Sequence, residues 1–292
     1  MSLKLDHIVI AVHDLERTIA DYGALGFHVV RGGDHPGRAT HNALVVFADG
    51  SYFELIAWRE PSPTERWWQL LQRHGEGIVD FALLPPSTAI TVADAKARGL
   101  LLEGPLDGGR VRPDGERLRW QTARSPSADL PFLCGDLTPR ALRVPEGEVR
   151  VHANGALGVA SLAIAVRDLD ATLARYRALL GTDVVDAGTH IGEPVALPGS
   201  NVRVAVIVLG GSVLVLSSPR KNPSNASRAG EGGDALAQRI AARGEGPYAL
   251  VLHTDRPQST GAFDLARTHG ALIELDLPPV GRKAKTASVA DA

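Results

Sequence analysis

The spacing of the apolar residues changes soon after the start of the chain. Residues 5–12 read LDHIVIAV, a short β-branched run that is typical of a strand. Asp14 then stands at a helix N-cap position, and the apolar residues Leu15, Ile19 and Tyr22 follow it at i, i+4 and i+7. The pattern predicts a strand followed by an amphipathic helix.

Three further strand candidates complete this unit. Residues 27–31, 42–48 and 51–58 have extended apolar patterns, and Asp49-Gly50 between the last two is a strong hairpin signal. The order is therefore β-α-β-β-β. It recurs weakly in a strand at 77–84, a helix at 87–99 and strands at 118–122 and 130–134.

The second half of the chain repeats the first. Residues 7–26, HIVIAVHDLERTIADYGALG, align with residues 161–181, SLAIAVRDLDATLARYRALLG, and Asp14 lies 154 residues before Asp168. The copies differ by modest insertions that loops would absorb. We therefore predict an α+β fold of tandem βαβββ units, paired into two modules at residues 1–140 and 155–285.

Composition narrows the range of functions. The 292 residues carry a formal net charge of −2, which gives no broad basic field for nucleic acid. The apolar runs are too short or too interrupted to span a membrane, and residues 1–12 lack the pattern of a signal peptide. Cys134 is the only cysteine, which fits a reducing compartment. We expect a cytoplasmic protein whose partner is a small molecule, neither nucleic acid nor a membrane.

Several segments together resemble one superfamily. They read LDHIVIAVHDLERTIADYGALGF, THNALVVFADGSYFELIAW, PDGERLRWQ and LPFL. The first module, and the second in degraded form, is similar to the glyoxalase-like domain of the vicinal oxygen chelate superfamily. The resemblance implies paired βαβββ units that close around a cleft, often with a divalent metal at its floor. Members of the superfamily include glyoxalase I, extradiol dioxygenases, epimerases, and resistance proteins that modify or sequester a drug, so the reaction stays open.

His7 and Glu54 are the leading candidates for chemistry. Alternation along the first strand separates His7 from an all-aliphatic face, and Glu54 lies in the apolar run YFELIAW, where an uncompensated carboxylate costs about 3 kcal/mol or more. The resemblance implies that these two positions approach one metal ion. Imidazole and carboxylate suit Fe(II), Mn(II), Zn(II), Co(II) or Ni(II). The second module has Ser161 and Val215 at the aligned places.

The rest of such a metal site is incomplete. The paired unit offers Asp80 at its first-strand position, but the LPFLCGD segment has no Glu. His41 is a local substitute as ligand or proton carrier, while His35 and Asn42 are candidates for substrate contacts. The alternatives are ordinary. A lone His on a strand is often a hydrogen-bonded core residue, and a half-buried Glu often pairs with an Arg. An Asp at a strand edge often caps a turn or pairs with a surface Arg.

A second cluster contains arginines and a tryptophan. Arg117 and Arg119 alternate onto one face of a strand with Trp120 turned away, and Arg110 and Arg112 precede them. A cleft-facing pair would bind a carboxylate or phosphate, and Arg117, Arg119 and Trp120 are candidate substrate contacts. The alternative is that these are solvated surface arginines.

Three functional hypotheses remain. The first is a divalent-metal-dependent enzyme of lyase, isomerase or dioxygenase type, acting on a small oxygen-rich metabolite in the first module, with His7, Glu54 and either His41 or Asp80 as ligands. The second is a metal-free, resistance-type protein that sequesters an aromatic or anionic small molecule through Arg119 and its neighbours. The third is an interaction scaffold with a salt-bridged Glu54. Whether a cleft closes within one chain or across a homodimer stays open.

Overall fold

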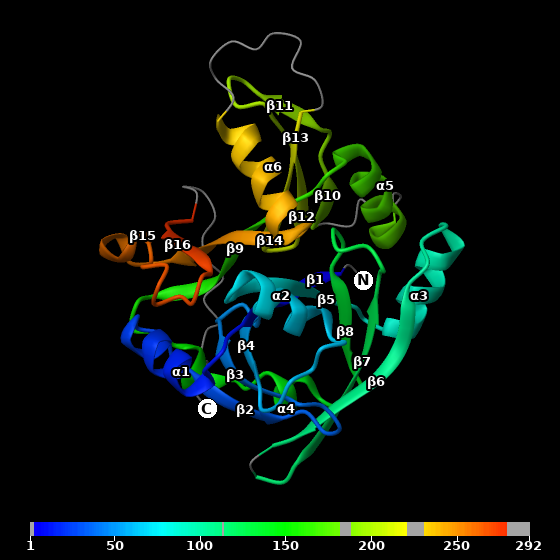
Figure 1. The fold of residues 1–292 in the computed structure, drawn as a ribbon. Helices are drawn as coiled ribbons and strands as arrows, with labels where there is room; N and C mark the ends of the chain where they lie inside the picture. Colours follow the sequence, from blue (N-terminus) through cyan, green and yellow to red (C-terminus); the bar gives the residue numbers. More distant parts are fainter. Residues whose placement is uncertain (1–2, 113, 182–187, 221–230, 279–292) are drawn as a thin grey trace.

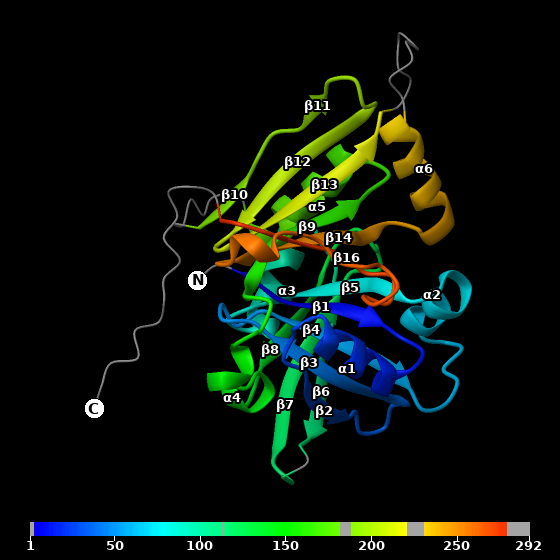
Figure 2. The ribbon, with the colours of Figure 1, turned by 90° about the vertical axis from the view of Figure 1, so that its left-hand side faces the viewer.

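A computed structural model describes residues 3–112, 114–181, 188–220 and 231–278. Within these ranges the strands form two sheets, one from each half of the chain (Figure 1, Figure 2). The α+β architecture predicted from the sequence is confirmed.

The first sheet has the strand order β2-β3-β4-β1-β5-β8-β7-β6. Its strands are β1 (Lys4–Ala11), β2 (Val30–Asp34), β3 (Thr40–Val46), β4 (Tyr52–Trp58), β5 (Gly77–Leu84), β6 (Glu103–Val111), β7 (Arg117–Arg124) and β8 (Phe132–Asp136). The accompanying helices are α1 (Leu15–Ala24), α2 (Arg66–His74), α3 (Thr88–Ala97) and α4 (Arg140–Arg143), followed by a 3-10 turn, η1 (Gly147–Arg150).

The second sheet has the order β10-β12-β13-β9-β14-β16-β15, with β11 also paired to β12. Its strands are β9 (Ala156–Ala165), β10 (Thr189–Ile191), β11 (Val195–Leu197), β12 (Val202–Leu209), β13 (Ser212–Pro219), β14 (Gly246–Thr254), β15 (Gly261–Ala262) and β16 (Leu272–Asp276). The helices here are α5 (Leu169–Leu180) and α6 (Glu231–Arg243), with a 3-10 turn, η2 (Pro257–Ser259).

Local signals explain the repeated strand-helix unit. The Asp14 side chain accepts from the Arg17 N–H at the start of α1, and Asp168 accepts from the Ala171 N–H at the start of α5, so both expected N-caps are confirmed. Gly50, at φ +81°, allows the tight turn between β3 and β4. The sequence patterns missed β6, because EGPLDGGRV has no alternation of apolar residues.

Within the first sheet an approximate two-fold axis relates the two βαβββ units. The antiparallel strands β1 and β5 pair His7 with Ala82 and Val9 with Asp80. The axis exchanges β1 with β5 and β4 with β8. Val9 pairs with Glu54 on the parallel strand β4, and its counterpart Ala82 pairs with Phe132 on the parallel strand β8. The axis therefore makes Asp80 the counterpart of His7, and Phe132 the counterpart of Glu54.

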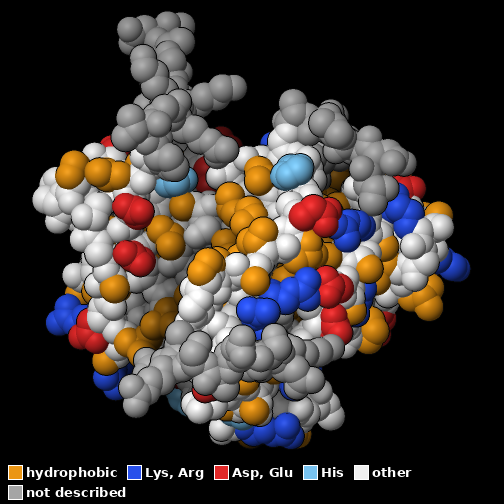
Figure 3. All heavy atoms as spheres, turned by 90° about the horizontal axis from the view of Figure 1, so that it is seen from above, with side chains coloured by type: hydrophobic (Ala, Val, Ile, Leu, Met, Phe, Trp, Pro, Cys, Tyr) orange, Lys and Arg blue, Asp and Glu red, His pale blue; other side chains and the backbone are white. Residues whose placement is uncertain are grey.

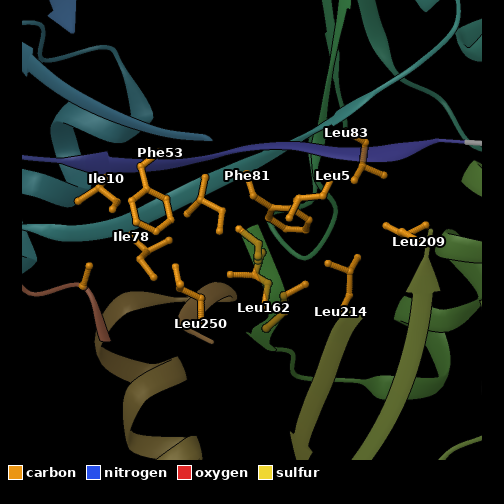
Figure 4. Packing of buried hydrophobic residues seen from close by; sticks show 14 of the residues in the cluster. Leu5, Ile10, Phe53, Ile78, Phe81, Leu83, Leu162, Leu209, Leu214 and Leu250 are labelled. Carbon is orange, nitrogen blue, oxygen red and sulfur yellow. The ribbon is translucent and has the colours of Figure 1, made fainter. Parts of the chain in front are cut away.

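The largest hydrophobic core lies between the two sheets. Ile10 and Phe53 of the first sheet face Leu162 and Leu250 of the second (Figure 4), and all four belong to one buried cluster. The other face of β1 contributes Val9 to a separate cluster on the concave side of the first sheet. Burial of the aliphatic face in the inter-sheet core leaves the opposite face free to build a site.

The two modules also contact each other through equivalent hydrogen bonds. Tyr22 on α1 donates from its hydroxyl to the carbonyl of Thr268, at 3.1 Å, and Tyr176 on α5 donates to the carbonyl of Asp129, at 3.3 Å. Each tyrosine is fully buried. The internal repeat is thus visible in the contacts between the modules as well as within each module.

The two modules differ in their outer strands. After β14, the part of the chain that the structure describes contains the short strands β15 and β16, where the first module has the extended hairpin of β6 and β7. The exposed apolar side chains of the second module include Val206 on β12 and Leu272 on β16, and Figure 3 shows apolar side chains gathered on the surface at this end of the molecule. No helix in the described part of the chain is long and apolar enough to cross a membrane.

Candidate functional site

The concave side of the first sheet encloses a cavity of about 790 Å³. That volume falls within the range of small-molecule sites, roughly 300–1,000 Å³. His7 on β1 and Glu54 on β4 both line the cavity and are 3% and 8% exposed. The structure thus brings together the two residues that the sequence singled out, on neighbouring strands.

The His7 imidazole lies between two carboxylates. Its Nδ1 is 2.7 Å from Asp6 Oδ2, and its Nε2 is 3.5 Å from Glu54 Oε2. The ring stacks on Tyr52, with 4.6 Å between centroids. Asp6 on one side and Tyr52 on the other therefore fix the ring with Nε2 directed at Glu54.

The charges of these groups follow from their neighbours. Burial by itself would raise the pKa of Asp6, but the Arg143 guanidinium and the His7 hydrogen bond hold it far below its ordinary value. Burial would lower the pKa of His7, but hydrogen bonds to Asp6 and Glu54 raise it above 6.5. Burial would raise the pKa of Glu54, but His7, His35 and the amide of Asn42 hold it at about 2. Glu54 is therefore an anion at neutral pH.

Arg143, from the segment between the modules, stabilises the two residues that hold the His7 ring, Asp6 and Tyr52. Its Nη1 donates to Asp6 Oδ2 at 2.8 Å and to the Tyr52 hydroxyl at 2.7 Å, and its Nε donates to Asp136 Oδ1 at 2.5 Å. Arg140 adds a second contact to Asp6, at 2.6 Å. The buried Asp6 charge is thus paired on several sides, as a buried carboxylate requires.

Asn42 and His35 form the next part of the polar wall. Asn42 Nδ2 donates to Glu54 Oε1 at 2.6 Å, and His35 Nε2 lies 3.6 Å from the same oxygen. His35 Nδ1 is 2.8 Å from the Thr40 hydroxyl, and burial lowers the pKa of this imidazole. Both residues proposed as substrate contacts therefore line the cavity beside Glu54.

Arg110 on β6 is the least compensated group in the wall. It is 5% exposed, its Nη2 donates to the carbonyl of Arg143 at 3.3 Å, and its buried Nη1 has no hydrogen-bond partner. Burial lowers its pKa. The buried Oδ1 of Asn42 also has no partner, and both atoms crowd Gly32, where a Cβ would come within 1.9 Å of Oδ1 and 2.6 Å of Nη1. Glycine at position 32 makes room for this pair.

An apolar wall lies on the other side of the cavity. Phe132 on β8 belongs to the concave cluster, and Trp67 on α2 and Trp120 on β7 pack against it. Phe132 meets the His7 ring edge-on at 5.3 Å. The cavity thus has one polar and one aromatic wall.

The cavity has an excess of positive charge. Seven arginines line it against four carboxylates, although the whole chain has a net charge of −2. The arginines are Arg38, Arg66, Arg110, Arg117, Arg119, Arg124 and Arg143, and the carboxylates are Glu54, Glu65, Glu103 and Asp107. Arg66 is paired with Asp80, and Arg143 with Asp6 and Asp136, so five arginines remain against the four carboxylates. This small excess of positive charge favours small anions.

Two proposed metal ligands do not reach Glu54. His41 pairs with Ala57 next to Asn42 on β3, so its side chain points to the opposite face, and it does not line the cavity. Asp80 is held by Arg66 Nη1 at 3.0 Å and by Trp67 Nε1 at 2.9 Å. Strand alternation turns His41 away from the cavity, and α2 supplies hydrogen-bond partners for Asp80.

A metal site that used both units would need ligands at the four positions of His7, Glu54 and their counterparts Asp80 and Phe132. His7 and Glu54 are available, Asp80 is bonded to Arg66 and Trp67, and Phe132 has no ligand atom. Among the residues that the structure describes, no three His, Cys, Asp or Glu side chains converge as a metal centre requires. The remaining donor pair, His7 Nε2 and Glu54 Oε2, fits part of such a site and not a complete one.

Arg117 and Arg119 of β7 lie at the edge of the cavity. The side chain of Arg119 is 64% exposed and lies near Asp107, and Arg117 is exposed as well, so both stand at the cavity mouth. Trp120, a candidate substrate contact, faces the cavity and meets His35 edge-on at 6.3 Å. Among the arginines of the β6–β7 cluster, the buried one that lines the cavity is Arg110. Arg110 pairs with Leu118 on β7, which is 1% exposed. The apolar Leu118 between two arginines was the sequence signal for the inward face of β7.

Comparison with known proteins identifies a family with this architecture. The model of a family described as a glyoxalase-like domain matches residues 5–180, which span the first module and reach the first strand and helix of the second. Among curated proteins none matches the sequence.

Solved structures share the fold at low sequence identity. A hypothetical protein from Staphylococcus aureus has a TM-score of 0.66 and 12% identity, over 94% of this chain and 100% of that one. A mutant 4-hydroxymandelate synthase from Streptomyces coelicolor has a TM-score of 0.61 and 14% identity, over 94% and 92%. A xylose isomerase-like TIM barrel/4-hydroxyphenylpyruvate dioxygenase fusion protein has a TM-score of 0.50 and 16% identity, over 92% of this chain and 38% of that one.

Proposed function

Because the chain belongs to the glyoxalase-like domain family, within the vicinal oxygen chelate superfamily, we propose that the cleft of its first module binds a small organic anion. The observation that carries this proposal is the Arg110 guanidinium, buried in the cleft wall with Nη1 unpartnered. Leaving a buried donor unpaired costs about 1–3 kcal/mol, and more for a charged group. Arg110 lines the cavity and forms no ion pair within the described part of the chain, so an anionic ligand would balance its charge.

The surroundings of Arg110 support the same ligand chemistry. Glu54 acts electrostatically on Arg110, but its oxygens already face His7, His35 and the Asn42 amide. Arg143, the nearest other cation, is paired with Asp6 and Asp136 and repels Arg110. A carboxylate or phosphate in the cleft would therefore gain from Arg110 without displacing an existing ion pair.

The test is a titration with organic anions and their neutral analogues. Monocarboxylates, dicarboxylates and phosphate monoesters should be titrated calorimetrically beside the corresponding amides or alcohols. We expect the wild-type protein to bind anions and not the neutral forms, and Arg110→Met to lose this binding. Arg119→Met, at the exposed mouth, is the control and should retain most of it. Equal anion affinity in Arg110→Met and the wild type would refute the proposal.

A second candidate function is favoured by the geometry of His7 and Glu54. Their Nε2 and Oε2 atoms face each other at 3.5 Å, and the low pKa of Glu54 keeps it ionised, the form in which a carboxylate binds a divalent cation. In this alternative the first module is a divalent-metal-dependent enzyme of lyase, isomerase or dioxygenase type. The incomplete donor set makes it the weaker candidate.

Elemental mass spectrometry of protein purified without chelators or a metal column distinguishes the two. About one equivalent of a divalent transition metal, lost in His7→Ala and retained in His41→Ala, would support the metal-dependent enzyme. No metal, with none taken up on titration, would refute it and leave the anion-binding function.

A further inference from the structure

The side of the second sheet that points away from the first sheet is apolar. Directly paired residues of neighbouring strands have their side chains on the same side of a sheet. One row of such pairs crosses five strands, from Val206 on β12 through Val215, Ala163 and Ala249 to Leu272 on β16. The residues before and after Val206, Val215 and Ala163 belong to the inter-sheet core, so the row points away from that core. We call this side of the sheet the outer face.

A second row on the outer face ends in complementary polar groups. It begins at His190 on β10 and ends at Glu274 on β16. The paired residues between these ends are, in order, Val208, Val213, Ser161 and Val251. Both end residues are exposed, and neither forms an ion pair within the described part of the chain. An imidazole and a carboxylate can bond, but at about 4.8 Å per strand these two stand roughly 24 Å apart on the same sheet.

Exposed apolar side chains gather on the outer face. Val206 and Leu272 are 39% and 49% exposed, and Val195 and Leu197 on β11 are 55% and 41% exposed. Val195 pairs with Val204 on β12, so the two β11 side chains lie on the same side of the sheet as Val206. A contiguous exposed apolar surface is typical of an interaction site.

The corresponding side of the first sheet is the floor of the cavity. In the repeat, Val215 stands where the first module has Glu54, and Ser161 stands where it has His7. In the first module, β6 and β7 enclose the space above this floor, whereas in the described part of the second module α6 covers one end of the outer face. The polar floor of the first module is thus an apolar surface in the second, which suits contact with another protein surface.

We infer that the outer face joins two copies of this chain in a homodimer, with the two-fold axis parallel to the strands between β13 and β9. Sheets pack face to face with their strands roughly aligned. A two-fold axis in this direction turns the second sheet over, so each half of a row meets the other half of the same row. The homodimer is independent of the anion-binding function of the first module.

The two halves of the first row are complementary in size under this axis. Val215 of one copy lies opposite Ala163 of the other, and Val206 lies opposite Ala249. A valine that meets an alanine at each of these places lets the two sheets approach without a gap. The row therefore forms a close-packed apolar centre.

The ends of the second row are complementary in charge. The same axis brings His190 of one copy near Glu274 of the other, and it does so at both edges of the interface. An imidazole that has no ion-pair partner in its own chain thus gains a carboxylate, and the carboxylate gains a donor. An apolar centre with a polar rim is the usual anatomy of a protein interface.

Sedimentation equilibrium of the full-length protein tests the homodimer. At micromolar concentrations we expect a mass of twice 30.9 kDa. Val206→Glu should raise the dissociation constant roughly a hundredfold or more, because it buries an unpaired carboxylate in the interface. Ile90→Glu is the matched control, because Ile90 is 64% exposed on α3 of the first module, and this variant should remain a dimer. Unchanged far-ultraviolet circular dichroism shows that both variants fold.

An exchange of charges tests the two-fold arrangement. His190→Glu places two carboxylates opposite each other at each edge and should weaken the dimer about two- to fivefold, the range for exposed pairs. Combining His190→Glu with Glu274→Lys restores opposite charges at both edges. The double variant should regain the dissociation constant of the wild type.

Each outcome bears on one part of the inference. A monomeric wild type would overturn the homodimer. A dimer that Val206→Glu leaves intact, or that Ile90→Glu disrupts equally, would overturn its assignment to the outer face. A double variant that dimerises no more tightly than His190→Glu would overturn the two-fold axis between β13 and β9.

Discussion

Arg110→Met should make the protein more stable while removing its anion binding. Arg110 is a buried cation whose Nη1 has no partner, and burial lowers its pKa, so the folded protein bears a cost for keeping the guanidinium charged. Methionine has a similar length and no charge, and its flexible side chain fills irregular space. The substitution therefore removes the unpaired donor without opening a large cavity.

The size of the effect follows from the bonds gained and lost. An unsatisfied buried donor costs about 1–3 kcal/mol, and the variant gives up one hydrogen bond, from Nη2 to the Arg143 carbonyl, worth about 1 kcal/mol. A net gain of about 1 kcal/mol is expected. For a protein of this size that raises the thermal midpoint by roughly 2–4 °C.

Thermal unfolding without ligand, followed by circular dichroism, measures this change. Arg143→Met is the contrasting variant: Arg143 is paired with Asp6 and Asp136, so its removal breaks two ion pairs, one of them to the fully buried Asp6, and should cost about 3–5 kcal/mol. If Arg110→Met lowers the midpoint, the guanidinium contributes to the fold as a paired group. The reasoning from its unpartnered Nη1 would then be refuted.

Three other substitutions test the site and the module contacts. Glu54 has a pKa of about 2 against an ordinary 4.5, so its ionised form stabilises the fold above pH 4.5 and this contribution is lost as the pH falls toward 2. One pKa unit corresponds to about 1.4 kcal/mol, so the free energy of unfolding of the wild type relative to Glu54→Gln should fall by about 3 kcal/mol between about pH 5 and about pH 2. Urea unfolding measures this difference, and a difference that does not change with pH would contradict the low pKa of Glu54. Gly32→Ala should lower the thermal midpoint because its Cβ would lie 1.9 Å from Asn42 Oδ1, whereas Gly23→Ala in α1, with nothing within 4 Å, should raise it slightly; equal effects would contradict the crowding. Tyr176→Phe removes an inter-module hydrogen bond and should cost about 1 kcal/mol in urea unfolding, and an unchanged stability would show that the bond contributes nothing.

The repeated units and their local elements could be derived from residue patterns alone. The spacing of apolar residues, the N-caps at Asp14 and Asp168 and the turn at Gly50 depend on neighbours a few positions away, and the structure has each of them. Strand β6 escaped notice because its stability comes from pairing with β7, a contact that leaves no apolar alternation in the sequence.

Part of the candidate site was also accessible from the sequence. His7 and Glu54 stand out because each is a polar residue in an apolar strand, and a buried polar group needs a partner. Alternation puts each of them on a defined face of its strand. The family resemblance indicated that the two faces meet, and the structure has them 3.5 Å apart.

Tertiary structure alone decided the remainder. Alternation shows that Arg119 and Trp120 lie on opposite faces, but only the closing of β6 and β7 onto the sheet determines that the indole points inward. Arg143 meets Asp6 across 137 positions of sequence, and Arg110 lacks a partner only because of what surrounds it in space. Contacts of this kind depend on long-range packing, whereas periodicity and capping depend on short stretches of chain, and this difference explains which features of the protein were predictable.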